Sequence, residues 1–147
     1  MCSESSNLDY STSEGGDAGG SKKKLNYEEW LLQSDYDLEV ADSMLTTGRN
    51  IYCVFMCHLS LEKALKGLYI KQTNQFPSKM HNLMYFVEKI DLNLPEDKKE
   101  FLVDINKLAI VTRYPEDLRK MIALYTKEQA NHIYQQAKAV QQWLKIQ

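Results

Sequence analysis

The chain has 147 residues, enough for one domain with a hydrophobic core, and its 44% hydrophobic and 26% charged residues are ordinary for a globular protein. No run approaches the eighteen apolar residues of a membrane span, because His58, Ser60 and Glu62 interrupt the best candidate. The N-terminus lacks the basic start and apolar centre of a signal peptide, and three cysteines do not suggest a disulfide framework. We therefore expect a cytoplasmic protein with no membrane segment.

The net charge of −2 is unevenly distributed. Residues 26–48 hold six acidic residues and no Lys or Arg, whereas residues 49–147 hold fifteen basic and ten acidic residues, a balance of +5. A basic surface attracts nucleic acid. Because this excess contains no dense basic run, a lysine-rich solvated surface is the favoured explanation.

Residues 1–25 are rich in Ser, Gly and acidic residues, so we expect a disordered tail. Residues 26–147 contain only two glycines and three prolines, which favours helices throughout. The prediction is an all-α domain, an antiparallel up-and-down bundle of four long helices plus one short helix.

The first helix is predicted over residues 27–46, with Asn26 as its N-terminal cap and Gly48 just beyond its end. The turn to the next helix is very short, and short turns join antiparallel neighbours. The second helix, residues 51–73, is apolar nearly all round for two turns, so other helices must enclose it. Gly67 lies within this helix, and a close helix crossing would explain it.

The remaining elements follow from apolar spacing and breakers. A short helix is expected within residues 80–90, and a long helix from Pro95 to about Tyr114. Residues 115–125 are predicted to be a connection with one helical turn around residues 118–123. The last helix begins at Thr126, which forms a capping box with Gln129.

Few side chains suggest chemistry. Cys53 and Cys57 share a helix face beside His58, but a closed zinc site needs four ligands and no second pair has matching spacing. Cysteine in an apolar helix is usually a small buried hydrophobe. We therefore expect no metal and no cofactor, and we expect His132 to lie at the surface or core edge.

The charged residues of the second helix are the exception. Glu62 and Lys66 are four apart in the order that favours an ion pair, and Lys63 lies beside them. They fit either a surface pair or charges used inside an enclosed helix, where a charge must be paired. Arg113 fits either multi-donor recognition of phosphate or a cation at a helix C-terminus.

Three segments together resemble the HEPN family (higher eukaryote and prokaryote nucleotide-binding domain): residues 57–66 (CHLSLEKALK), 81–83 (HNL) and 112–117 (TRYPED). The resemblance spans most of residues 27–144. It implies a helical bundle that often dimerises and acts on RNA or nucleotides, frequently beside a nucleotidyltransferase in a toxin–antitoxin pair. It also implies a site with Arg113 as the tentative catalytic residue and five ligand-binding residues: Glu62, Lys63, Lys66, His81 and Tyr114.

Many HEPN proteins are metal-independent endoribonucleases whose signature is an Arg followed, after four to six residues, by a His. This sequence departs from that signature. No His stands at the required spacing after Arg49, Arg113 or Arg119, so the usual proton-transfer group is missing from its place.

Three hypotheses follow. The first is a HEPN module that binds nucleotide, RNA or a partner nucleotidyltransferase without the usual nuclease site, with Lys66 and Arg113 contacting phosphate. The second is a nuclease toxin in which His81 or His132 replaces the missing His. The third is a scaffold whose acidic first helix, with Asp35, Asp37 and Asp42, faces a basic partner.

Overall fold

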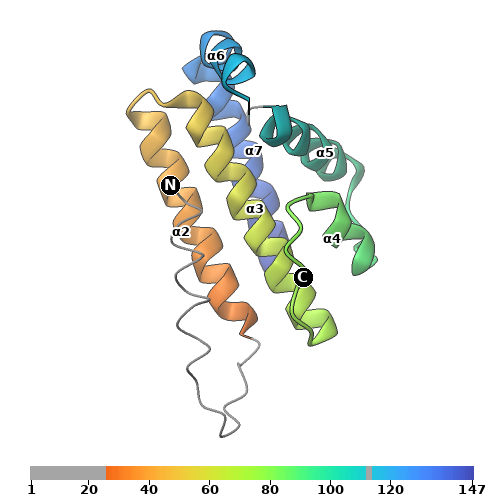
Figure 1. Ribbon diagram of the computed structural model, residues 1–147. Coiled ribbons are helices and arrows are strands. Elements are labelled where there is room, and N and C mark those ends of the chain that lie inside the picture. The colour runs from red at the N-terminus through yellow and green to blue at the C-terminus, as the bar shows by residue number, and fades with distance from the viewer. Residues whose placement is uncertain (1–25, 112–113) are drawn as a thin grey trace, which may run out of the picture.

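The computed structural model describes residues 26–111 and 114–147, and these residues form six helices and no strand. The all-α prediction is confirmed. The predicted disordered tail lies outside the described residues. The helices, shown in Figure 1, are α2 (Tyr27–Thr46), α3 (Asn50–Thr73), α4 (Leu83–Lys89), α5 (Glu96–Val111), α6 (Pro115–Leu124) and α7 (Lys127–Lys145).

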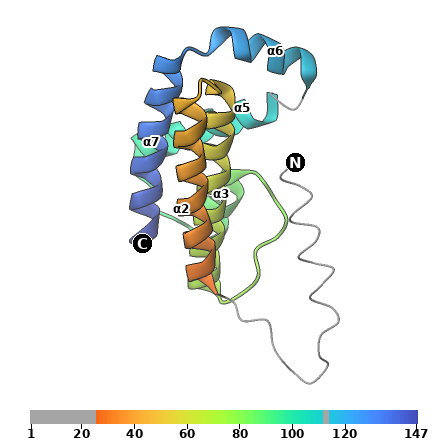
Figure 2. The same cartoon turned by 90° about the vertical axis from the view of Figure 1, so that its left-hand side faces the viewer.

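Helix α3 is the centre of the domain. It packs most extensively against α2 and α7, and it also contacts α4, α5 and α6. Figures 1 and 2 show α2 running antiparallel to α3, with α7 beside them and α5 set obliquely. Enclosure on several sides explains why the helix is apolar nearly all round, and residues such as Cys53, Leu61 and Leu65 are fully buried.

Gly67 lies where α2 packs tightly against α3. A Cβ atom built there would lie 3.2 Å from the Trp30 Cβ and 3.2 Å from the Tyr27 carbonyl oxygen. Both distances are tighter than ordinary contacts, so a larger residue would force the two helices apart. The close crossing expected from the sequence is therefore confirmed.

The predicted helix ends agree with the structure at three positions. Asn26 Oδ1 accepts hydrogen bonds from the backbone N–H groups of Glu28 and Glu29, and Gly48 adopts a φ of 82° just past α2. Thr126 and Gln129 form the reciprocal capping box at the start of α7. Local side-chain and backbone chemistry thus fixes where these helices begin and end.

The segment after Tyr114 differs from the prediction. Instead of a connection with one helical turn, residues 115–124 form the ten-residue helix α6. Pro115 stands at its first position, where the missing N–H costs nothing, and Glu116 and Asp117 favour the positive end of the helix dipole. Leu118 and Met121 turn inward onto the core, although no residue of α6 is fully buried.

A buried polar network joins α2, α3 and α7. Ser34 and Ser60 each donate a hydroxyl hydrogen bond to the other's carbonyl oxygen, at 2.7 and 2.8 Å. Gln141 Nε2 donates to Ser34 Oγ at 3.1 Å and to Asp35 Oδ1 at 2.7 Å, and Lys145 pairs with Asp35 at 2.8 Å. We call these five residues the Ser34 network, which aligns the three helices.

Candidate functional site

A second polar group lies where α2, α3 and the segment before α4 meet. Its centre is Glu62, which is 5% exposed. Lys66 Nζ lies 2.9 Å from Glu62 Oε2, and His81 Nδ1 lies 3.2 Å from both Glu62 oxygens. We call this group the charged cluster, and its members are Asp37, Glu62, Lys63, Lys66 and His81.

Lys66 is enclosed rather than presented to solvent. The residue is 6% exposed, and its ammonium lies 5.9 Å from the Trp30 ring centroid and 5.6 Å from that of Phe86. Aromatic faces stabilise a cation, and Glu62 neutralises its charge. This ammonium is therefore enclosed by the protein and paired with Glu62.

Lys63 turns toward α2. Its Nζ lies 3.0 Å from Asp37 Oδ2. The two groups form an ion pair, but their angles do not fit a hydrogen bond. Burial raises the pKa of Asp37, and Lys63 partly offsets that rise, while the nearby charge of Glu62 adds to it. Both lysines of the CHLSLEKALK segment are thus neutralised by carboxylates of the fold.

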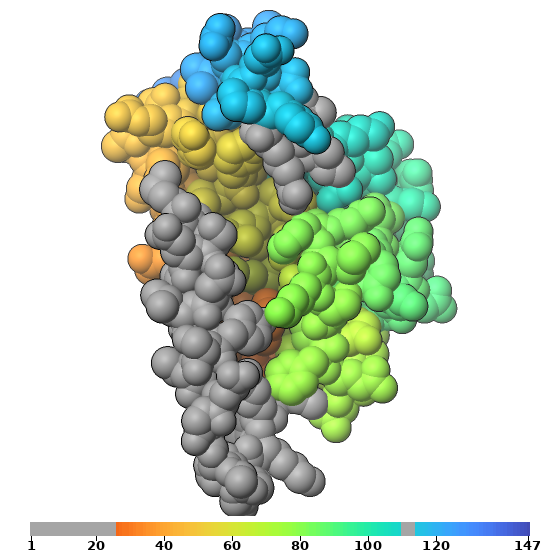
Figure 3. Space-filling view, in the orientation of Figure 1, coloured from red at the N-terminus to blue at the C-terminus, as the bar shows by residue number. Residues whose placement is uncertain are grey.

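His81 is the exposed member of the charged cluster, with 59% of its side chain accessible. An ionised Glu62 only accepts hydrogen bonds, so Nδ1 of His81 must be the donor. In the neutral ring this leaves Nε2 as an acceptor, on the side of the imidazole away from Glu62. Figure 3 shows the green segment of residues 74–89 forming the surface over the C-terminal half of α3, which carries Glu62 and Lys66.

The structure therefore brings together four of the six predicted site residues: Glu62, Lys63, Lys66 and His81. Tyr114 stands at the start of α6, 65% exposed and outside the bonds of the charged cluster. Arg113 lies outside the described residues. His132 is exposed on α7.

Asp37 belongs to the charged cluster and the Trp30 ring lies beside Lys66, although the sequence did not single out either residue for the site. Asp37 lies on the inward face of α2, beside the buried Leu38 and Ala41. A carboxylate at such a position needs a buried cation. That mismatch with the apolar stripe is the signal from which a charged partner on α3 could have been inferred.

The two central cysteines behave as core residues. Cys53 and Cys57 are fully buried free thiols. A thiol–thiol hydrogen bond lowers the pKa of Cys53 and, together with burial, raises the pKa of Cys57. Among the described residues, no three His, Cys, Asp or Glu side chains gather as metal ligands.

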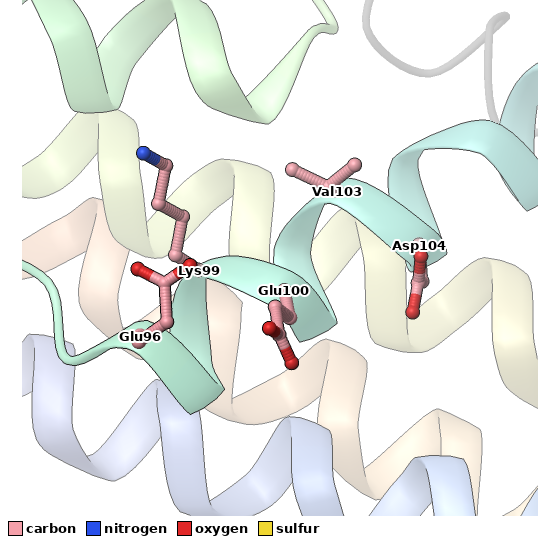
Figure 4. A pocket seen from close by; sticks show the side chains of 5 residues that line it. All are labelled: Glu96, Lys99, Glu100, Val103 and Asp104. Atoms are coloured by element: carbon pink, nitrogen blue, oxygen red, sulfur yellow. The ribbon is translucent and has the colours of Figure 1, made fainter.

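Two hollows of the surface are lined by residues of α5. One, of about 300 Å³, is lined by Glu96, Lys99, Glu100, Val103 and Asp104. Figure 4 shows Glu100 and Asp104 pointing to one side of α5 and Lys99 to the other, so these side chains do not converge. A hollow without convergent polar groups makes a poor ligand site.

No described helix is long and apolar enough to cross a membrane. Two solved structures share the fold. TT1696 from Thermus thermophilus matches with a TM-score of 0.71 and 24% identity, over 83% of this chain and 98% of that one. ST0689, an archaeal HEPN homologue, matches with a TM-score of 0.63 and 22% identity, over 84% of this chain and 97% of that one.

A search of curated proteins gives no match. The family model described as HEPN domain matches residues 27–147, which is all of the helical body. The three segments that carry the resemblance in the sequence lie within this range. The chain belongs to the HEPN family.

Proposed function

We propose that this HEPN protein binds the phosphate group of a nucleotide or RNA at His81, without the usual Arg–His nuclease site. The supporting observation is the pairing of an exposed imidazole with a buried carboxylate. Glu62 holds Nδ1 at 3.2 Å while 59% of the His81 side chain stays accessible. When both ring nitrogens carry a proton, Nδ1 donates to Glu62 and Nε2 donates outward, so a histidine held in this way is oriented in advance for a phosphate oxygen.

Further positive charge for a phosphate is proposed to come from a residue other than the two lysines of the charged cluster. Lys63 and Lys66 already have carboxylate partners. Arg113, predicted from the sequence to contact phosphate, remains in the proposal as the second cation, since a guanidinium suits multi-donor recognition. Tyr114, 65% exposed, is proposed to stack on a base.

Calorimetric titration with ATP and with a short single-stranded RNA tests the proposal. His81→Ala is expected to weaken binding about tenfold, the effect of a lost charge-assisted contact. His132→Ala is the matched control, because His132 is an exposed histidine on a different helix. Equal affinities for wild type and His81→Ala would remove His81 from the site.

The nuclease hypothesis gains one observation from the structure. A carboxylate that orients a histidine is an arrangement used for proton transfer. His81 Nε2 would accept the proton of a ribose 2′-hydroxyl as that oxygen attacks the adjacent phosphate. A 2′,3′-cyclic phosphate forms, the bond from phosphorus to the 5′-oxygen breaks, and the 5′-oxygen takes a proton from water. RNA cleavage in chelator, present in wild type and lost in His81→Ala, would favour this second function over binding alone.

The scaffold hypothesis keeps only Asp42 of the three acidic residues that the sequence suggested. Asp35 belongs to the Ser34 network and Asp37 to the charged cluster, so reversing either charge would disturb the fold itself. Glu39 and Asp42 are exposed on α2. Loss of a basic partner on reversal of these two charges, with the fold intact, is the appropriate test.

A second copy of the chain and a nucleotidyltransferase remain the proposed partners. Helix α6 exposes 55% of Ile122 and 66% of Leu124, which suits a contact between copies. Light scattering is expected to give a dimer that Ile122→Glu with Leu124→Glu converts to a monomer. Leu32→Glu, at a 62% exposed position of α2, is the control and should leave the dimer intact. A monomeric wild type would contradict the dimer.

A further inference from the structure

Two neighbouring residues, His81 and Asn82, are tied to successive turns of α3. His81 bonds directly to Glu62. Asn82 reaches the previous turn through Asn106 of α5, which bonds to His58. His58 and Glu62 are four apart and therefore lie on one face of the helix. The chain just before α4 is thus fixed to α3 at two points.

Asn106 makes three side-chain hydrogen bonds at the junction of α3, α4 and α5. Its Oδ1 accepts from the Leu83 backbone N–H at 3.1 Å and lies 3.2 Å from His58 Nε2. Its Nδ2 donates to Asn82 Oδ1 at 3.2 Å. Since Leu83 N–H can only donate, the oxygen of the amide must face it. His58 Nε2 is then the donor to that same oxygen.

Asn82 is at the same time the N-terminal cap of α4. Its Oδ1 accepts from the Met84 backbone N–H at 3.0 Å. Asn106 therefore fixes both the cap residue and, through Leu83, the first residue of the helix. A seven-residue helix does not form stably by itself, so α4 depends on such tertiary contacts for its start.

The position of Asn106 on α5 also points to a specific role. Asparagine is unfavourable within a helix because its amide competes for backbone hydrogen bonds. Here the amide instead bonds to groups of two other elements of the domain. A leucine would suit a helix interior better on propensity alone.

We propose that Asn106 is the positioning residue of the His81 site. By fixing Asn82 and the start of α4, it holds His81 where Nδ1 reaches Glu62, and the imidazole presents Nε2 outward. Asn106 itself does not touch His81 or a ligand. The proposal rests on the proposed function for its ligand, but its geometric part is measurable without one.

The test is the tautomer of His81, read from the two ring ¹⁵N chemical shifts at a pH where the ring is neutral. Wild type is expected to show the Nδ1–H form, because Glu62 accepts that proton. Asn106→Leu is expected to give a mixture of both tautomers. Asn106→Asp, which keeps the oxygen acceptor and loses the donor to Asn82, should give an intermediate result. The ring shifts of His132 serve as the internal control.

Titration with ATP completes the experiment. Asn106→Leu is expected to weaken binding about fivefold, the effect of one lost supporting hydrogen bond, whereas Asn131→Leu, at an exposed position of α7, should leave it unchanged. An unchanged His81 tautomer in both Asn106 variants would overturn the positioning role. A wild type that shows the Nδ1–H tautomer but binds no nucleotide would overturn the proposed function alone. If Asn106→Leu does not fold, Asn106→Asp carries the comparison.

Discussion

The Ser34 network and the charged cluster both include residues of α3, and they differ in which part of the chain completes them. Every member of the Ser34 network lies on a long helix, and Lys145 closes it through an ion pair with Asp35. The charged cluster depends on His81, which comes from an irregular segment and is 59% exposed. A polar group completed within the helices aligns the fold, whereas one completed by an exposed histidine can also meet a ligand.

Because of this difference, we expect mutations in the Ser34 network to change stability alone and mutations in the charged cluster to change both stability and ligand binding. Loss of a buried member of either group removes hydrogen bonds or ion pairs of the interior and should destabilise the fold. Only the charged cluster should also affect a ligand, because only there does a buried carboxylate orient an accessible side chain.

Glu62→Ala is expected to have the largest effect, about 3–5 kcal/mol of lost unfolding free energy, because it leaves the Lys66 ammonium buried without a counter-charge. It should also weaken nucleotide binding, since His81 loses its partner. Urea unfolding measures the first effect and titration the second. Glu88→Ala, at an exposed position of α4, is the control.

The double variant Glu62→Leu with Lys66→Met sharpens this result. Removing both charges and keeping the volume should restore most of the stability, because no buried charge is left unpaired. Nucleotide binding should stay weak, since His81 still lacks a carboxylate. Recovery of binding together with stability would show that Glu62 acts only on the fold.

Gln141→Leu probes the Ser34 network and should cost about 1–2 kcal/mol, since it removes two side-chain hydrogen bonds while Ser60 and Lys145 still satisfy their own partners. Nucleotide affinity should not change. Gln142→Leu, at the exposed neighbouring position, provides the control. A loss of affinity in a folded Gln141→Leu protein would break the distinction between the two polar groups.

The sequence predicted the elements whose determinants are local. Asn26, Gly48 and the Thr126–Gln129 box mark helix ends by their own hydrogen bonds and backbone geometry, and each was confirmed. The all-round apolar pattern of α3 likewise predicted its central place. The prediction gave α6 only one turn around residues 118–123, whereas the helix begins at Pro115, which suits a first helical position, and continues to Leu124.

Side-chain contacts between different helices were harder to predict from the sequence. The i,i+4 spacing predicted the bond between Glu62 and Lys66, which the structure shows at 2.9 Å. No local pattern predicts that Lys63 turns to Asp37, 26 residues earlier, or that Asn106 bonds to Asn82. These contacts depend on how α2 and α5 pack on α3, and tertiary packing has no signature at fixed spacing.

The smallest expected effect concerns the pH dependence of stability at Asp37. Its pKa in the fold lies above its ordinary value of 3.8, so between these two values the folded state binds a proton that the unfolded state has lost. The Asp37 contribution to stability therefore decreases as pH rises through this window, by at most about 1.4 kcal/mol per pH unit for one proton. Asp37→Asn should remove this decrease from the pH profile of urea unfolding, whereas Asp104→Asn, at an exposed position, should leave it in place. A wild-type profile whose slope in this window is the same as that of Asp37→Asn would show that Lys63 fully offsets the burial of this carboxylate.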